Sequence, residues 1–207
     1  MSAADRLTPL GVMVLSMLRE DAMHPYEMIR LMRLRRDDRI LSLTNGTFYH
    51  TVARLERAGL IASTGVDRDG NRPERTTYAL TPAGSGAATA WVRRELVRTG
   101  RPTEFRVALA EAHDLARDEV IALLEGRRDL LRADAAELTL ALAEARATGL
   151  PDQYLVEADR ESALAAADLA WLDAFLGRLR DPDTIWGEHA GGKTSARYLA
   201  QRKAARE

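Results

Sequence analysis

One stretch constrains the fold of this chain more than any other: residues 44–60, T-N-G-T-F-Y-H-T-V-A-R-L-E-R-A-G-L. Its first two residues are threonine and asparagine, whose side-chain oxygens accept hydrogen bonds from the N–H groups that open a helix. Apolar residues then follow at spacings of four and three, which predicts a helix with one face in a core. The residues of this predicted apolar stripe are Phe48, Val52 and Leu55.

The opposite side of this predicted helix carries small or hydrogen-bond-donating side chains. After it, residues 60–66 and 75–80 alternate as strands around the turn signal D-G-N at 69–71, which predicts a β-hairpin. Arginines lie near the hairpin tip, where they either grip phosphates or remain solvated, and the preceding helix favours DNA contact. A helix followed by such a hairpin is typical of a winged DNA-recognition unit.

Three motifs in order resemble the signature of PadR-type bacterial transcriptional regulators. G-T-F-Y-H-T-V-A-R-L-E-R-A-G-L-I at 46–61 resembles G-T-L-Y-P-x-L-x-R-L-E-x-x-G-L-I, H-P-Y-E at 24–27 resembles H-G-Y-E, and T-Y-A-L-T-P-A-G at 77–84 resembles Y-x-L-T-x-x-G. The chain departs from the family pattern at Pro25, Phe48 and His50, where the family has glycine, leucine and proline. His50 lies on the predicted DNA face, so contacts there do not carry over from the family.

The resemblance implies an N-terminal winged helix-turn-helix, and it implies that Thr47 and Tyr49 contact the DNA backbone. Together with the helix and hairpin patterns, it gives a predicted DNA-binding set. This set is Asn45, Thr47, Tyr49, His50, Arg54, Arg57, Arg68, Arg72 and Arg75. Some PadR relatives bind planar aromatic effectors near a dimer interface, and an indole can stack on such a ligand. Trp91 and Trp171 are therefore candidate effector contacts, with core packing as the alternative for each.

The N-terminal part contains the other helices that such a domain needs. A helix start is predicted at Thr8-Pro9, at His24-Pro25 and at Thr81-Pro82. The first of these helices covers residues 8–20, the second begins at residue 24, and the third ends at about residue 97. T-G-R-P at 99–102 then breaks the chain, so we expect a winged-helix domain at 1–98. Residues 1–99 have 15 arginines and 11 carboxylates, a net charge of +4, and the remainder carries −5. The positive part thus coincides with the predicted DNA-binding domain.

Residues 99–182 are predicted to be a coiled-coil-like helical domain. Helices over about 118–148 and 152–179, each roughly 40 Å long, carry apolar residues at alternating spacings of three and four, the pattern of a heptad seam. The seams bury against each other or against a second copy, and the PadR resemblance favours the second copy, because the larger PadR subclass dimerises through a helical C-terminal domain. The predicted dimerisation residues are Leu124, Leu131, Leu138, Leu142 and Ala165.

Several classes of function are disfavoured. The chain has no cysteine, its four histidines lack metal-ligand spacing, and no nucleophile has a base beside it, so we expect neither an enzyme nor a cofactor. G-E-H-A-G-G-K-T at 187–194 fits the phosphate-loop pattern, but no βαβ unit surrounds it, and we interpret residues 183–207 as a basic tail. No apolar run is long enough for a bilayer, so a cytoplasmic protein is expected.

The sequence therefore predicts a mainly α-helical, homodimeric regulator that binds double-stranded DNA at a near-palindromic operator. We expect a repressor that is relieved by a small aromatic effector. The alternative is a winged-helix protein-interaction module without DNA binding. The two differ in salt dependence, because phosphate contacts release counterions and make DNA affinity fall steeply as salt rises.

Overall fold

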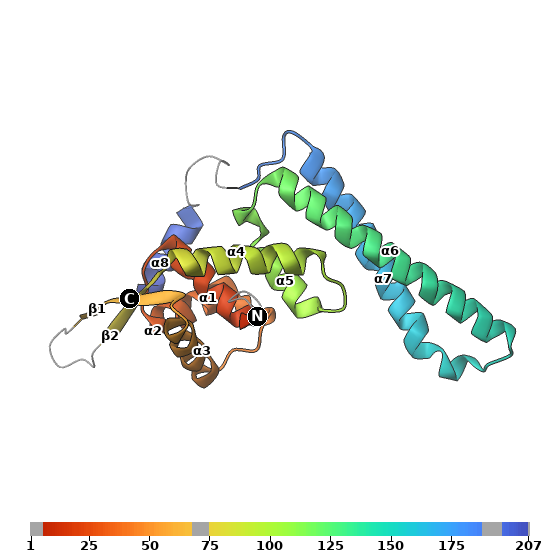
Figure 1. The fold of residues 1–207 in the computed structure, drawn as a ribbon, viewed down its shortest axis with the longest axis horizontal. Coiled ribbons are helices and arrows are strands. Elements are labelled where there is room, and N and C mark those ends of the chain that lie inside the picture. The colour runs from red at the N-terminus through yellow and green to blue at the C-terminus, as the bar shows by residue number, and fades with distance from the viewer. Residues whose placement is uncertain (1–5, 68–74, 188–195, 207) are drawn as a thin grey trace.

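The computed structural model describes residues 6–67, 75–187 and 196–206. It is mainly helical with one two-stranded antiparallel sheet, as predicted. Figure 1 shows a compact head, formed by α1 to α4 with β1 and β2, and a long arm formed by α6 and α7. The elements are α1 (Pro9–Glu20), α2 (Pro25–Arg35), η2 (Asp37–Arg39), α3 (Asn45–Arg57), β1 (Ile61–Asp67), β2 (Arg75–Leu80), α4 (Pro82–Val97), α5 (Pro102–Ala110), η3 (Ala112–Asp114), α6 (Arg117–Ala147), η4 (Asp152–Tyr154), α7 (Val156–Arg180) and α8 (Ala196–Arg206).

Threonine caps begin three helices of the head. The Oγ1 of Thr8 accepts from the backbone N–H of Gly11 at 3.2 Å, Thr44 accepts in the same way at 3.2 Å, and Thr81 at 3.1 Å. Proline occupies the first turn of α1 and α4, where a backbone N–H would have no partner inside the helix. The predicted starts of α1, α3 and α4 are therefore confirmed.

The apolar stripe of α3 lies in the core of the head. Phe48, Val52 and Leu55 are 0%, 3% and 2% exposed, which confirms the predicted core-facing side. They lie in one apolar cluster with residues of α1, α2 and α4. Because three side chains one turn apart are fixed in this way, the rotation of α3 about its own axis is fixed as well.

The wing is an antiparallel pair in which Ile61 faces Leu80, with an irregularity between Ser63 and Gly65. A third segment joins its base, because the turn between α1 and α2 forms a bridge to β2. Met23 and Tyr78 exchange two backbone hydrogen bonds there, each 3.0 Å long. The predicted turn at 69–71 lies outside the described residues.

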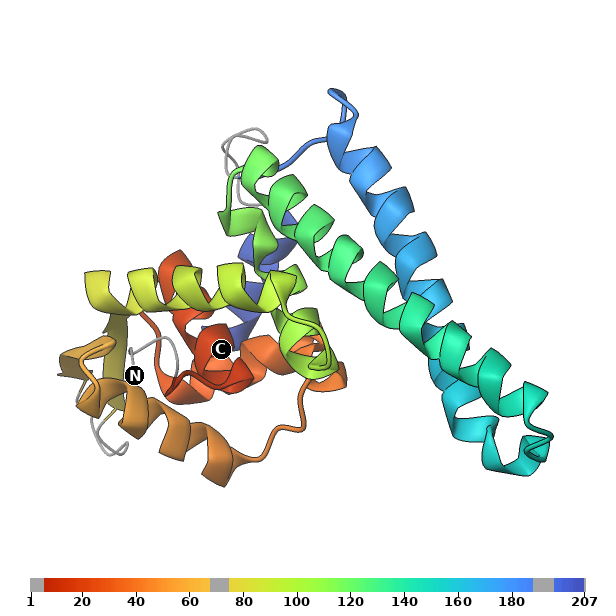
Figure 2. The same cartoon turned by 45° about the vertical axis from the view of Figure 1, so that its right-hand side comes forward.

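The arm is an antiparallel hairpin of α6 and α7 (Figures 1 and 2). The predicted seam residues line its interior: Leu124 is 0% exposed and Leu142 is 5% exposed, and Leu131, Leu138 and Ala165 are partly buried. The seams of the two helices thus bury against each other within one chain. Helix α7 thus covers these residues at least in part within one chain, and their predicted contact with a second copy stays a prediction.

Ion pairs add to the contact between the two arm helices. Arg128, the one charged residue in the α6 seam, lies 3.6 Å from the carboxylate of Asp173 on α7. Arg132, one turn along α6, reaches the same carboxylate at 3.0 Å. The charged interruption in the heptad pattern is therefore matched by an acid on the facing helix, which helps to fix the register of the hairpin.

The C-terminal segment differs from the predicted basic tail. Residues 196–206 form α8, which packs along α2 of the head (Figure 1). Ala205 is 1% exposed and belongs to the core cluster of the head. The sequence signal was weak, because α8 carries no apolar stripe long enough to predict burial. The phosphate-loop pattern at 187–194 lies almost entirely outside the described residues.

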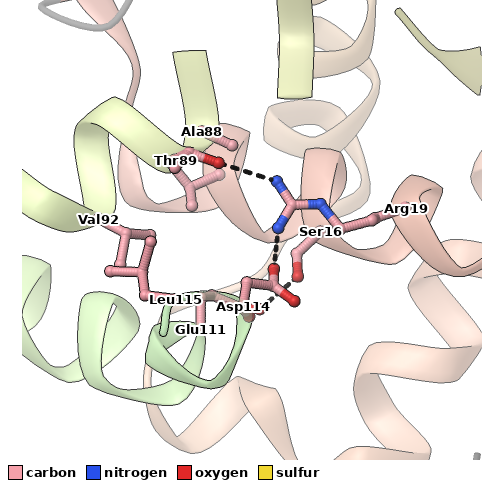
Figure 3. A pocket seen from close by; sticks show the side chains of 9 residues that line it. Ser16, Arg19, Ala88, Thr89, Val92, Glu111, Asp114 and Leu115 are labelled. Carbon is pink, nitrogen blue, oxygen red and sulfur yellow. Dashed lines mark hydrogen bonds and ion pairs between the residues drawn. The ribbon is translucent and has the colours of Figure 1, made fainter. Parts of the chain in front are cut away.

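Polar side chains join the head to the base of the arm (Figure 3). Ser16 of α1 donates to the carboxylate of Glu111, and Arg19 pairs with Asp114 of η3. The second terminal nitrogen of Arg19 donates to Thr89 Oγ1 at 3.3 Å, so one guanidinium links α1, α4 and η3. Burial raises the pKa of Glu111 above its usual value, although the hydrogen bond from Ser16 opposes this. The hollow among these side chains, of about 10 Å³, has room for about one water.

Two glycines of α4 allow a test of how closely this helix packs against Leu60, the residue before β1. A Cβ built on Gly84 would lie 2.0 Å from the carbonyl oxygen of Leu60, whereas one on Gly86 would meet nothing within 4 Å. We expect Gly84→Ala to lower the free energy of unfolding by about 2 kcal/mol or more. Gly86→Ala should instead raise it by up to about 1 kcal/mol through helix propensity. Urea unfolding measures both, and a Gly84→Ala midpoint equal to that of the wild type would contradict this packing.

Candidate nucleic-acid interface

The first two turns of α3 present an uncharged polar surface to solvent. Asn45, Thr47, Tyr49 and His50 are all exposed, and Tyr49 keeps 46% of its surface. The rotation of α3 that buries Phe48 turns these side chains outward. They offer hydrogen-bond donors and acceptors of the kind that read base edges and phosphates. The structure thus leaves four residues of the predicted DNA-binding set exposed on the first two turns of α3.

Arg54 does not point freely outward as predicted. It is half-buried, and its Nη2 donates to the Oγ1 of Thr8 at 2.9 Å, so it ties α3 to the start of α1. The helical wheel placed Arg54 opposite Phe48, but it could not show that α1 begins beside it. Arg57, in contrast, is exposed, with its Nε donating to the carbonyl of Ala53 within the helix at 3.3 Å.

An acidic side chain limits the binding face of α3 at its C-terminal end. Glu56 is exposed and accepts a hydrogen bond from the hydroxyl of Tyr78 on β2 at 3.3 Å. Burial and the neighbouring Glu56 carboxylate raise the pKa of Tyr78, so its hydroxyl remains a donor. Because a carboxylate repels phosphates, a duplex is better accommodated by the N-terminal half of α3 than by its last turn.

Helix α2 contributes a basic face that the sequence analysis missed. Tyr26, Arg30 and Arg33 follow at spacings of four and three; Tyr26 is 54% exposed, Arg33 is exposed and Arg30 is half-buried. The Arg30 guanidinium lies 5.9 Å from the centre of the Tyr26 ring, within the range of a cation–π contact. Arg33 donates to the side-chain oxygen of Asn45 at 3.4 Å. We define these residues of α2, together with Asn45, Thr47, Tyr49 and His50, as the α2–α3 face.

The spacing of Tyr26, Arg30 and Arg33 was visible in the sequence. Spacing alone does not show that these side chains lie beside α3, because that depends on how α2 packs against α3. The remaining members of the predicted set lie in the wing. Arg68 and Arg72 fall outside the described residues, and Arg75 is the first residue of β2, paired in register with Asp67. The wing arginines therefore stay a prediction.

The two candidate effector tryptophans have different environments. Trp91 is 1% exposed and packs in the core of the head, and it also lines a hollow beside the start of α1. Trp171 is 38% exposed and stacks on Phe175 with ring centres 5.1 Å apart, near the edge of Phe105.

A hollow of about 360 Å³ lies between the start of α1 and the turn from α4 to α5. Its polar lining is rich in arginine: Arg6, Thr8, Arg94, Arg98, Arg101 and Glu104.

One group of side chains has the composition of a metal site. Potential ligand atoms of Glu111, His113 and Asp114 lie within 4.8 Å of one another. Two of these three residues already have partners, since Glu111 accepts from Ser16 and Asp114 pairs with Arg19. The group is therefore accounted for by the junction of head and arm. Among the described residues, no helix combines the length and apolar character that a bilayer span requires.

A comparison with known protein families gives a match within the head. Residues 14–90 match the family model described as “Transcriptional regulator PadR-like family”. A search of curated proteins gave no match. The match to this family model covers α1 from Val14, the whole of α2, α3 and the wing strands, and the first part of α4.

The chain is also similar to solved structures. These include Bacillus subtilis PadR in complex with operator DNA, with 18% identity and a TM-score of 0.38 over 82% of this chain and 98% of that one. Bacillus subtilis PadR in complex with p-coumaric acid has 17% identity and a TM-score of 0.36 over 84% and 100% of the two chains. A PadR-like transcriptional regulator from Bacillus cereus has 19% identity and a TM-score of 0.34 over 87% and 100%. At these TM-scores the likeness does not bear on how the head and arm are arranged.

The contact of Arg54 predicts that its loss affects folding. Arg54→Ala removes a charged donor from the half-buried hydroxyl of Thr8, and we expect the free energy of unfolding to fall by about 1–2 kcal/mol. Arg57→Ala, a matched change one turn further along α3, should stay within about 0.5 kcal/mol of the wild type. Chemical unfolding of both variants provides the measurement. Equal stability of the two variants would show that Arg54 is not anchored to Thr8 in solution.

Proposed function

We propose that this chain, whose residues 14–90 belong to the PadR-like family of transcriptional regulators, is a dimeric, sequence-specific DNA-binding repressor that a small-molecule effector releases. The observation that supports DNA binding best is the α2–α3 face. There two arginines of α2 stand beside an uncharged polar surface of α3, and Arg33 is bonded to Asn45. Cations beside a helix with neutral donors and acceptors are the combination that a duplex requires, since phosphates fix the register and base edges supply the specificity.

The chemistry of each side chain suggests which part of the DNA it would contact in the proposed complex. Asn45 and His50 are suited to base edges in the major groove, and Thr47 and Tyr49 to the backbone. Arg30 and Arg33 would bind phosphates on one side of the groove. The wing arginines Arg68, Arg72 and Arg75, with Arg57, would bind phosphates on the other side. Arg54 would act by holding α3 against α1.

We propose that a second copy binds the outer side of α7 rather than the seam. The outer side carries apolar and small residues, and Val156, Leu164 and Trp171 are 64%, 47% and 38% exposed. Apolar surface of this kind on a long exposed helix favours burial against another chain. Two heads held by paired arms would meet successive major grooves on one side of DNA, about 34 Å apart, which gives a near-palindromic operator.

The arginine-lined hollow is the proposed effector site. Its volume of about 360 Å³ suits a small ligand, and Arg6, Arg98 and Arg101 favour a negatively charged one. It lies where the head meets α5, the helix that leads towards the arm. An effector that binds better to one arrangement of head and arm would shift the population away from the spacing that DNA requires. Trp171 would contribute only if the ligand reached the base of the arm.

The second candidate function is a winged-helix protein-interaction module without DNA binding. The exposed carboxylate of Glu56 on α3 favours it, because a phosphate-binding face gains nothing from an acid. A direct binding experiment separates the two. The probe is a duplex from the region upstream of this gene, titrated with the full-length chain at about 50 mM and about 200 mM salt.

If the chain binds DNA, its affinity should fall steeply between these two salt concentrations, by about tenfold or more. Arg30→Ala combined with Arg33→Ala should weaken binding about tenfold at low salt and reduce the slope of log K against log salt by about two. Arg146→Ala, which removes an exposed cation at the tip of the arm paired with Asp159 at 2.7 Å, serves as the control and should change neither quantity. Absence of binding at low salt would favour the interaction module.

The dimer proposal predicts different effects of two leucine substitutions on the arm. Leu164→Asp, on the outer side of α7, should shift the protein to monomer, because it buries a charge in the proposed interface. Leu140→Asp, at a leucine of α6 that is 65% exposed, should leave the dimer intact. Light scattering after size-exclusion chromatography gives the mass of each variant. A dimeric Leu164→Asp variant would rule out the α7 surface.

A further inference from the structure

Helix α8 carries positive charge onto an acidic edge of the head. Arg202 pairs with Asp21 in the turn between α1 and α2. Arg206 lies 2.9 Å from the same carboxylate, and its Nε lies 2.8 Å from Glu27 of α2. Gln201 donates to the backbone carbonyl of Leu34 at 3.4 Å, so α8 contacts α2 near both of its ends.

These ion pairs are partly shielded from solvent. The side chains of Arg202 and Glu27 are 15% and 13% exposed, whereas those of Asp21 and Arg206 remain about half exposed. Burial tends to raise the pKa of Asp21, but the hydrogen bonds from Arg206 and Ala22 and the charge of Arg202 outweigh it, so the pKa lies below its usual value. The Asp21 carboxylate is therefore charged at neutral pH, and the two arginines supply its counter-charge.

Glu27 lies at the edge of the α2–α3 face, and Asp21 is joined to it through their shared partner Arg206. Glu27 directly follows Tyr26, which is 54% exposed, and the neighbouring turn of α2 carries Arg30. Without α8, Asp21 and Glu27 would add two negative charges beside the cations that are to bind phosphates. At physiological salt, charges influence one another over about 8 Å, which includes neighbouring turns of a helix.

We propose that Arg202 and Arg206 of α8 are positioning residues for DNA binding, which act by cancelling the negative charge of Asp21 and Glu27 at the edge of the α2–α3 face. This inference rests on the proposed function. On this view α8 does not itself contact DNA through these arginines. It converts an edge that would repel phosphates into a neutral one, and the C-terminal segment becomes part of the DNA-binding apparatus.

Four forms of the full-length chain test the proposal against the same duplex at low salt: the wild type, Arg202→Gln/Arg206→Gln, Asp21→Asn/Glu27→Gln, and the variant that combines all four changes. The arginine variant leaves both carboxylates uncovered and should bind DNA at least about threefold more weakly, with a smaller difference at higher salt. The carboxylate variant should bind at least as well as the wild type. The combined variant should return to within about twofold of the wild type, although it lacks every ion pair between α8 and the head.

The combined variant decides the mechanism. If it binds as weakly as the arginine variant, the arginines act through phosphate contact or packing, and the proposal is wrong. Wild-type affinity of the arginine variant would also overturn it. Lys203→Gln is the matched control, because it removes an exposed cation of α8 that lies between the two arginines, and it should change affinity less than twofold. Failure of the wild type to bind any duplex would instead reject the proposed function, and circular dichroism with thermal unfolding checks that each variant is folded.

Discussion

The burial of Phe48 is the packing constraint on which the geometry of the proposed DNA-binding face depends. With Val52 and Leu55 it fixes the rotation of α3, and this rotation alone determines that Asn45, Tyr49 and His50 lie on the outside. Burying three such side chains contributes several kcal/mol, far more than any single polar contact on the exposed side. The buried side of α3 therefore positions the proposed interface, and the exposed polar residues can vary without loss of the fold.

The sequence was sufficient to predict elements whose signals are local. Threonine caps, prolines in first helical turns and apolar stripes gave the bounds of α1, α3, α4 and the wing strands to within about two residues, because each signal acts within one turn. It was not sufficient where a residue's partner is remote in the chain. Arg54 bonds to Thr8, and Trp91 lies in the core of the head, and neither contact leaves a trace in local spacing.

The sequence also did not reveal the packing partners of the heptad seams or of the C-terminal helix. A repeat of leucines predicts that one face of a helix is buried, but it does not predict which helix covers that face. In this structure α7 covers the seam of α6. Helix α8 is attached to the head by the buried Ala205 and by the ion pairs of Arg202 and Arg206, and such ion pairs have no periodic signature in the sequence. The basic composition of residues 183–207 was recognised, but its acidic partners on the head were not.

Tyr78 connects three parts of the head. Its backbone is bonded twice to Met23 at the turn before α2, and its hydroxyl donates to Glu56 near the end of α3. The base of the wing, the start of α2 and the end of α3 are thus braced together at one residue. This bracing resists a change in the angle between the wing and α3, so in the proposed DNA complex we expect differences in operator length or curvature to be absorbed by bending of the DNA or of the arm.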